Sequence, residues 1–439
     1  MVDSGSAPRL FAVSRPLAEV PGTDELLALA DPRNPLVWMR GDRGCVGIGE
    51  VLRLGFGGPE RFAEAAAAWR GIAARASIDD PVGLPGTGPL AFGVFAFADG
   101  SEAASALVVP RLIVARNGGR AWLTEVSTEP LHGEPALPSN ADRAGADRAG
   151  ADPIEAGPAG GSWTGVGLPI DSPDPEYLTG VAEATARIER GGVEKIVLAR
   201  SVAGRIGASD DLRVPVGRLA SRYEDCWTFA VDGMIGASPE TLVRRTEGVV
   251  SARVLAGTRG RKADPAADAR ARDELLANPK EQHEHAFAVQ SVVTALGPHV
   301  RDLECSEQPF ALELPNVWHL ATDLTAVPSR EASSLELVEA LHPTAAVAGT
   351  PTRVAVAAIA ELEPFDRERY AGAVGWIDAA GDGEWVIALR CAQVGAPEAD
   401  GSRTVTAYAG GGILADSDPE REFGETVSKF RPVAEAFAP

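Results

Sequence analysis

Residues 175–200 read PEYLTGVAEATARIERGGVEKIVLAR, a helix signal followed directly by a strand signal. Apolar side chains recur at helical spacing in the first part, which predicts an amphipathic helix over 175–190. They are Tyr177, Val181, Ala184 and Ile188. The paired glycines at 191–192 favour a helix end there. The apolar, β-branched run over 193–199 then predicts a buried strand.

Outward from this stretch, strand signals come in groups and helix signals come between the groups. Strand-like runs precede it at 36–39, 90–97 and 111–115, and follow it at 370–377, 385–394 and 404–408. Helices are predicted at 59–76, at 275–296 and onward from the Asp418-Pro419 start. In the helix at 275–296 we expect five side chains to face inward: Ala288, Val289, Val292, Val293 and Leu296. The grouping favours an α+β layer architecture over a regular βαβ alternation.

The composition is that of a globular protein with a large core, because 45% of the 439 residues are hydrophobic and 23% are charged. No apolar run reaches the ~18 residues that a membrane span needs. Residues 1–16 lack the basic and then apolar pattern of a signal peptide. The four cysteines lie far apart without a CxxC pair, which argues against a disulfide framework or a zinc site. We therefore expect a cytoplasmic protein without membrane spans.

Acidic residues outnumber basic ones by 62 to 41, which gives a formal net charge of −21. Such a field repels nucleic acid and anionic membranes, so neither is an expected partner. It also repels small anionic substrates. A ligand of that kind needs a local cluster of Arg and Lys side chains or a bound cation.

Residues 133–162 stand apart, because they are rich in Ala, Gly, Pro and Asp and contain almost no large apolar side chain. The unit ADRAG occurs at 141–145 and again at 146–150. A repeat this short buries too little surface to offset the entropy lost on ordering it. We interpret 133–162 as a flexible insertion between 1–132 and 163–439.

Lys195 lies in the predicted strand, and its side chain points away from the face that Ile196 and Leu198 share. If the lysine face is buried, desolvation lowers the pKa of the amine below its ordinary value of ~10.4, which suits a general base. An edge-strand lysine in water is the simpler interpretation from spacing alone.

Two further motifs have ordinary structural interpretations beside the chemical ones. Ser238-Pro239-Glu240 is typical of a helix start, with the serine as cap and the glutamate near the helix dipole. The small-residue turn at 255–259 places Gly257 and Thr258 beside basic residues. Its N–H groups and cations suit a carboxylate, although a loop of solvated charge is the simpler account.

Two predicted helices carry glutamate pairs at helical spacing. Glu281 and Glu284 are three residues apart, and Glu422, Glu425 and Lys429 share one face of the last helix. Carboxylates from two helices can jointly hold a hard divalent cation such as Mg²⁺. Solvated faces with intrahelical ion pairs explain most Glu/Lys patterns of this kind.

Taken in chain order, these segments resemble the chorismate-utilising enzymes, most closely the isochorismate synthases. The resemblance is strong from Tyr177 to the C-terminus and loose over the N-terminal third. The matching motifs are EKIVLAR (194–200), GASPE (236–240), LAGTR (255–259), KEQHEH (280–285), VWHL (317–320), LHPTAAVAGTP (341–351), YAG (370–372), VGW (374–376), ALRCA (388–392), AGGGI (409–413) and the segment 417–429.

The resemblance implies both a fold and a reaction. The fold is a single large α+β domain with a two-layer antiparallel β-sandwich core flanked by helices, so the insertion lies inside one domain. The reaction is Mg²⁺-dependent conversion of chorismate to isochorismate, in which water adds at ring C2, the C4 hydroxyl departs and the double bonds shift. The product of such an enzyme feeds siderophore, menaquinone or salicylate-derived pathways. We expect a monomer.

Matching motif by motif implies roles for single residues. Lys195 deprotonates the water, and Glu240 protonates the leaving hydroxyl. The implied Mg²⁺ ligands are Glu284 and Glu425 directly, with Glu281 and Glu422 through waters. The implied substrate contacts are Gly257 and Thr258 near the ring carboxylate, and Tyr370, Arg390, Gly410 and Lys429 at the enolpyruvyl carboxylate.

Two positions favour water over other nucleophiles. Relatives that use ammonia, such as anthranilate synthase component I, carry Gln where Lys195 stands, and aminodeoxychorismate synthase has a lysine where Ala256 stands. Salicylate synthase uses the same lysine and water and then eliminates pyruvate, so it stays the nearest alternative. A catalytically inactive ligand-binding homologue would lack one of four residues, and all are present: Lys195, Glu240, Glu284 and Glu425.

Overall fold

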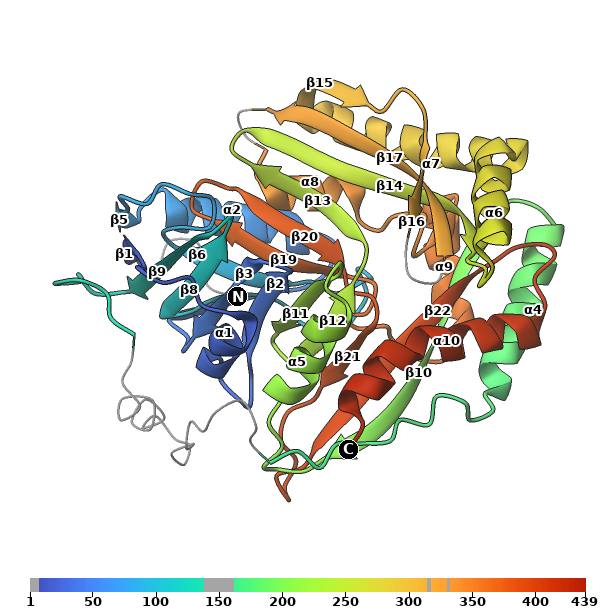
Figure 1. The fold of residues 1–439 in the computed structure, drawn as a ribbon. Helices are drawn as coiled ribbons and strands as arrows, with labels where there is room; N and C mark the ends of the chain where they lie inside the picture. The colour runs from blue at the N-terminus through green and yellow to red at the C-terminus, as the bar shows by residue number, and fades with distance from the viewer. Residues whose placement is uncertain (1–7, 138–161, 314–316, 330–331) are drawn as a thin grey trace.

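The structure, a computed structural model, describes residues 8–137, 162–313, 317–329 and 332–439. Two β-sheets form its centre, and helices lie against their outer surfaces (Figure 1). One apolar core cluster contains side chains from both sheets, among them Trp38 of the first and Trp385 of the second. Most of the expected insertion at 133–162 lies outside the described residues.

Among the described residues the first sheet has twelve strands; β1 and β5 run parallel, and the other neighbouring strands run antiparallel. In spatial order the strands are β18 (Gly349–Thr350), β10 (Lys195–Ile206), β22 (Arg403–Ile413), β21 (Cys391–Val394), β12 (Met234–Ser238), β11 (Trp227–Val231), β2 (Leu36–Arg40), β3 (Arg43–Ile48), β8 (Leu112–Asn117), β9 (Arg120–Ser127), β1 (Phe11–Pro16) and β5 (Ser77–Asp79).

Counted over the same described residues, the second sheet has ten strands, all paired antiparallel. In spatial order they are β15 (Val300–Cys305), β17 (Val317–Pro328), β14 (Val249–Gly260), β13 (Thr241–Thr246), β20 (Gly383–Ile387), β19 (Ala373–Asp378), β6 (Leu90–Val94), β7 (Ser105–Val109) and β4 (Leu52–Phe56), with β16 (Phe310–Glu313) paired to β17.

Both sheets join strands from before and after the insertion. In the first sheet β2 pairs with β11, with Trp38 opposite Phe229. In the second, β6 pairs with β19, with Gly93 opposite Gly375. Because both ladders run unbroken from one half of the chain to the other, the halves share one core. The predicted single α+β domain with a β-sandwich is confirmed.

Several helices begin at the same local signal, an Asp or Asn cap followed by proline. Asp174, for example, accepts a hydrogen bond from the Tyr177 N–H at 2.9 Å. Pro175 occupies the first helical position, where a backbone N–H would have no partner within the helix, so proline loses no hydrogen bond there. In the part of the chain that the structure describes, the helices are α1 (Thr23–Leu29), α2 (Arg61–Ala73), α4 (Pro175–Glu189), α5 (Arg213–Arg222), α6 (Pro265–Ala277), α7 (Pro279–Leu296), α8 (Ser334–Leu341), α9 (Thr352–Leu362) and α10 (Pro419–Phe437), with a 3₁₀ turn η1 (Gly297–His299). Among the described residues, none of them is long and apolar enough to cross a membrane.

Two elements expected as single units are divided. The helix predicted over 275–296 is two helices, α6 and α7, which meet at Asn278 because Pro279 disfavours a helical conformation there. Of the five side chains expected to face inward only that of Leu296 is buried, and the other four are partly exposed. The strand predicted over 385–394 stops at Ile387 and resumes at Cys391, and between them Arg390 has a φ of +50°. The strand predicted over 370–377 begins only at Ala373.

Candidate active site

Lys195 begins β10, which at this point passes between β22 and the two-residue strand β18. Its neighbours Ile196 and Leu198 are buried in the core cluster. A Cβ placed on Gly412 of β22 would lie 2.6 Å from Lys195 Cε. The lysine side chain therefore lies against the bare backbone of that glycine, on the face that the strand alternation predicts for it.

The charges of the predicted site residues act together at Lys195. Burial lowers the pKa of its amine, and the negative charge of Glu240 is the largest opposing influence. The nearby ammonium of Lys429 lowers the pKa further, whereas Glu284 and Glu425 raise it. An edge-strand lysine in water is therefore not what the structure shows.

Glu240 lies between β12 and β13, so the interpretation of 238–240 as a helix start is wrong. The Ser238 hydroxyl donates to the Ile387 carbonyl at 2.6 Å and accepts the Glu240 N–H at 3.2 Å, which holds the turn against β20. Burial raises the pKa of Glu240 to about 7, against the lowering effects of Lys195 and Arg390. A carboxyl group of that pKa is largely protonated just below neutral pH, as a general acid requires.

Gly257 and Thr258 lie in a bulge, where the register of β14 against β17 shifts. Gly257 has a φ of +85°, and a Cβ there would lie 2.9 Å from Glu281 Oε2. The Thr258 hydroxyl is 2.8 Å from Nδ1 of His319 on β17. The bulge thus places both predicted substrate contacts beside the first acidic residue of α7.

His319 is a site residue that the sequence interpretation missed. Burial lowers the pKa of its ring, and the positive charges of Arg390 and Lys429 add to the effect. The signal was present in the strand-like motif VWHL, since Trp318 and Leu320 are buried and alternation places His319 on the opposite face.

Arg390 occupies the break between β20 and β21. Within the described part of the chain its guanidinium forms no hydrogen bond or ion pair. Its charge nevertheless lowers the pKa values of Glu240 and His319. An unpaired guanidinium at this place suits an anionic ligand.

The remaining predicted substrate contacts lie on or beside β22. The buried ring of Tyr370 stacks on that of Tyr408, with centroids 5.2 Å apart. The Lys429 ammonium donates to the Gly410 carbonyl at 2.8 Å and pairs with Glu425 Oε1 at 2.6 Å. Lys429 thus joins a predicted substrate contact to a predicted metal ligand.

The four predicted metal-binding glutamates form two pairs. On α10, burial raises the pKa of Glu422, and the like charge of Glu425 adds to it while Ser417 opposes it. On α7, burial and then the charge of Glu284 raise the pKa of Glu281. A divalent cation would relieve both repulsions.

The two pairs are not gathered into one cluster. Throughout the residues that the structure describes, no three His, Cys, Asp or Glu side chains converge into a group that could hold a metal ion. Both predicted direct ligands contact lysines instead, since Glu284 Oε1 lies 3.9 Å from the Lys280 ammonium and Glu425 pairs with Lys429.

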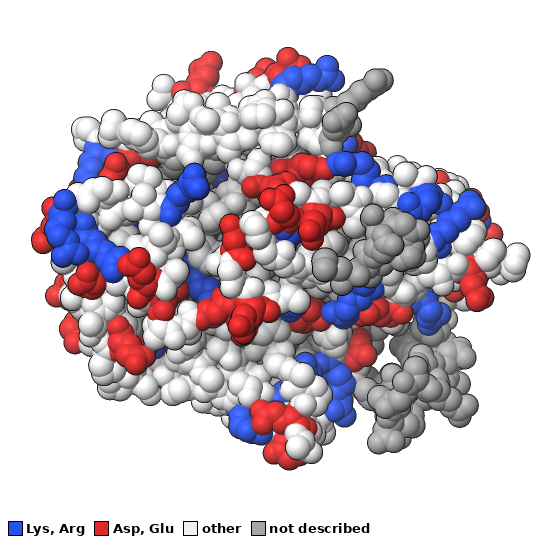
Figure 2. All heavy atoms as spheres, turned by 180° about the vertical axis from the view of Figure 1, so that it is seen from behind, with Lys and Arg blue, Asp and Glu red and all other residues white. Residues whose placement is uncertain are grey.

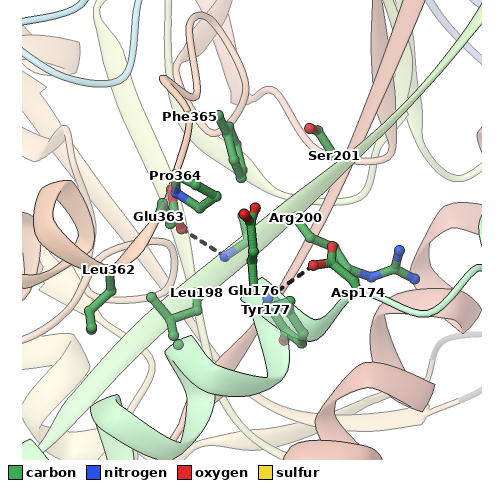
Figure 3. Close-up of a pocket in the computed structure, with 12 residues that line it drawn as sticks. Asp174, Glu176, Tyr177, Leu198, Arg200, Ser201, Leu362, Glu363, Pro364 and Phe365 are labelled. Carbon is green, nitrogen blue, oxygen red and sulfur yellow. Dashed lines mark hydrogen bonds between the residues drawn. The ribbon is translucent and has the colours of Figure 1, made fainter.

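A pocket of about 240 Å³ lies elsewhere, between α4, β10 and residues 362–365 (Figure 3). Its lining includes Asp174, Tyr177, Arg200 and Glu363, and none of the predicted site residues. Glu363 accepts the Ala199 N–H at 2.7 Å, which satisfies the outer edge of β10. The outer surface is acidic, as the net charge of −21 leads one to expect: Asp and Glu gather in several groups on the face opposite to Figure 1 (Figure 2).

The amine of Lys195 has a lowered pKa, the carboxyl group of Glu240 has a raised pKa, and each group acts on the pKa of the other. Together they form a base and acid pair. The cations Arg390 and Lys429 beside them supply the local positive charge that an anionic substrate needs on an acidic protein. The arrangement suits proton transfer at two positions of a small anionic molecule.

Residues 3–438 match the family described as "Chorismate binding enzyme". Isochorismate synthase DhbC of Bacillus subtilis (strain 168) is 41% identical over 279 residues, which cover 60% of this chain and 68% of that protein. The crystal structure of a putative 2,3-dihydroxybenzoate-specific isochorismate synthase, DhbC from Bacillus anthracis, matches with a TM-score of 0.70 and 32% identity, over 94% of this chain and 98% of that one. MenF, the menaquinone-specific isochorismate synthase from Escherichia coli, matches with a TM-score of 0.74 and 26% identity, over 97% and 95% of the two chains.

Proposed function

Because the chain belongs to the family of chorismate binding enzymes, we propose that it is an isochorismate synthase, an isomerase that converts chorismate to isochorismate. The observation that carries this proposal is the pair formed by Lys195 and Glu240, whose pKa values are displaced in opposite directions by one shared environment. The resemblance found in the sequence motifs is confirmed at the level of family and fold.

The reaction needs one proton removed and one supplied. Lys195, whose amine gives up its proton more readily because burial lowers its pKa, accepts a proton from the water that adds to ring C2. Glu240, protonated near neutral pH, gives its proton to the C4 hydroxyl, which leaves as water while the ring double bonds shift. Water enters and water leaves, so the product is an isomer. Exchange with solvent then returns the proton from Lys195 and reprotonates Glu240.

The substrate's carboxylates are held by cations and backbone groups. We assign the enolpyruvyl carboxylate to the unpaired guanidinium of Arg390 and to Lys429, with Tyr370 and the Gly410 backbone beside them. We assign the ring carboxylate to the bulge at Gly257 and Thr258. These contacts fix the ring between base and acid, which is where orientation contributes most to rate.

We propose Mg²⁺ as the cofactor, because the donor set consists of oxygens alone. Glu284 and Glu425 would hold it directly, and Glu281 and Glu422 through waters. The fit is best on α10, where Glu422 Oε2 and Glu425 Oε1 lie 3.4 and 3.8 Å from the point that a Cβ on Gly411 would fill. When bound, the ion neutralises the ring carboxylate.

Removing either direct ligand is expected to abolish the response to Mg²⁺. Glu284→Gln and Glu425→Gln should each lower the rate at any Mg²⁺ concentration by about a hundred-fold or more, at least the loss seen when outer ligand partners are changed. Rate measured against MgCl₂ concentration checks this. Glu420→Gln, an exposed position on the same helix as Glu425, is the control. A wild-type Mg²⁺ response in either ligand variant would reject that ligand.

Gly412→Ala is expected to lower kcat by about ten- to a hundred-fold, because the new methyl group would lie 2.6 Å from Lys195 Cε and displace the amine. The fold should persist, since the displaced group is the end of a flexible side chain. Gly395→Ala is the matched control, because a Cβ there meets nothing closer than 3.6 Å. Equal kcat values for the two variants would show that the placement of Lys195 does not matter.

Chromatography of the products formed from chorismate and Mg²⁺ tests the proposed function directly. We expect isochorismate as the single product. Salicylate together with pyruvate would show the salicylate synthase reaction instead, and recovery of chorismate alone would refute the proposed activity.

We further propose a cytoplasmic enzyme of siderophore or menaquinone biosynthesis, since the relatives include enzymes named for 2,3-dihydroxybenzoate and for menaquinone.

A further inference from the structure

The hydroxyl of Tyr177 is a buried polar group that the proposed reaction leaves unexplained. Tyr177 is 4% exposed, and among the described atoms its hydroxyl has no hydrogen-bond partner. A buried donor without an acceptor costs free energy that a single hydrogen bond would recover. Its lack of a partner points to an acceptor that approaches only in another state of the protein.

Three oxygens surround one small space above Gly411. A Cβ on this glycine would lie 3.4 Å from Glu422 Oε2, 3.8 Å from Glu425 Oε1 and 3.8 Å from the Tyr177 hydroxyl. The other oxygen of Glu422 already accepts the Ser417 hydroxyl at 2.9 Å. Oε2 is therefore the carboxylate oxygen that faces the tyrosine side of this space.

The backbone holds the tyrosine in this position. Tyr177 is in the first turn of α4, and its N–H is fixed by the Asp174 cap at 2.9 Å (Figure 3). Its ring belongs to the main core cluster, together with Val181 and Ala184 of the same helix. A side chain anchored at both its backbone and its ring presents its hydroxyl at a fixed point beside the two carboxylates.

We propose that Tyr177 is a positioning residue for Glu422 and Glu425. When a divalent cation is bound, a carboxylate of this pair accepts a hydrogen bond from the tyrosine hydroxyl. A phenol is a donor that carries no charge, so it can orient a carboxylate without competing with the cation for it. Outer partners of this kind orient the groups that hold a metal and tighten its binding. This inference rests on the Mg²⁺ site of the proposed function.

The test is calorimetric titration of MgCl₂ into the free protein, without chorismate. Tyr177→Phe keeps the ring and removes one oxygen, and we expect the Mg²⁺ dissociation constant to rise about ten-fold. Thr185→Val is the matched control, because it removes from the same helix a hydroxyl that bonds to the Val181 carbonyl within α4. The control should bind Mg²⁺ as the wild type does. Melting curves without Mg²⁺ show whether the variants fold alike.

Gly411→Ala gives a second, independent reading, since its methyl group would occupy the space among the three oxygens. At 3.4 Å and beyond the new contacts are ordinary ones, so the fold should tolerate it. We expect it to weaken Mg²⁺ binding at least as much as Tyr177→Phe. Binding within about two-fold of the wild type in either variant, or no Mg²⁺ binding by the wild type, would overturn the inference.

The outcomes separate this inference from the proposed activity. If Tyr177→Phe weakens Mg²⁺ binding but the wild type forms no isochorismate, the positioning role stands and the isomerase proposal fails. If isochorismate forms and Tyr177→Phe binds Mg²⁺ normally, the isomerase proposal stands and the positioning role fails.

Discussion

Lys195→Met is expected to lower kcat by about a thousand-fold, within the range that a positioned general base contributes. Lys195 is partly buried, its pKa is lowered, and its side chain lies against the bare backbone of Gly412. Methionine matches the length of the lysine stem, so it fills the same space without a titratable group. Stopped assays of isochorismate formation measure the loss.

Binding and folding should survive this substitution. The enolpyruvyl carboxylate is assigned to Arg390 and Lys429 and not to Lys195, so calorimetric chorismate affinity should stay close to that of the wild type. Lys262→Met, at an exposed lysine, is the control for removing an amine. A kcat for Lys195→Met within about ten-fold of the wild-type value would remove Lys195 as the base.

Glu240→Gln is expected to lower kcat by about a hundred- to ten-thousand-fold and to change the pH profile. Glu240 acts as an acid only while protonated, and its pKa is about 7, so the wild-type rate should fall as the pH rises through that value. Lys195 acts only while neutral, so the rate should also fall as the pH drops through the lowered lysine pKa. Because the two groups interact, the apparent pKa values of the acid and alkaline limbs belong to the pair and not to either residue alone. Glutamine cannot titrate, and the alkaline limb should disappear.

The same substitution should stabilise the protein at alkaline pH. A carboxyl group whose pKa is raised by folding contributes stability below its unfolded value, near 4.5, and loses that contribution as the pH rises through about 7. Glu240→Gln should therefore melt at a higher temperature than the wild type above that pH, with the difference vanishing in acid. Glu247→Gln, at an exposed turn of the next hairpin, should show neither effect. A Glu240→Gln variant with a normal rate and an intact alkaline limb would reject Glu240 as the acid.

Local sequence signals predict much of the fold. The helix at 175–190 and the strand that follows it appear as α4 and the start of β10, because cap, proline, apolar spacing and paired glycines all agree there. The sequence also marks the break between α6 and α7, at Asn278-Pro279, although the apolar spacing across it favours one continuous helix. The break at Arg390 carries no such mark, since its positive φ occurs where the chain passes from β20 of the second sheet to β21 of the first.

The geometry of the candidate active site depends on contacts between distant parts of the chain, which the spacing of residues in the sequence cannot predict. Ser238-Pro239-Glu240 has the composition of a helix start, and only the pairing of β12 and β13 with strands more than a hundred residues away makes it a turn. The spacing predicts Tyr177 as a core residue of an amphipathic helix, which it is, yet its hydroxyl borders the same small space as the carboxylates of α10. Such residues serve both the core and the site, and the sequence pattern reports the first role alone.

Turnover of chorismate in water enriched in ¹⁸O tests most directly whether the base and the acid act on one bound ring. If Lys195 activates a solvent molecule while Glu240 expels the original hydroxyl, mass spectrometry of the isochorismate should find one heavy oxygen, located at C2. Unlabelled isochorismate would mean that the hydroxyl migrates within the substrate without solvent, and the assignment of these two residues would be wrong.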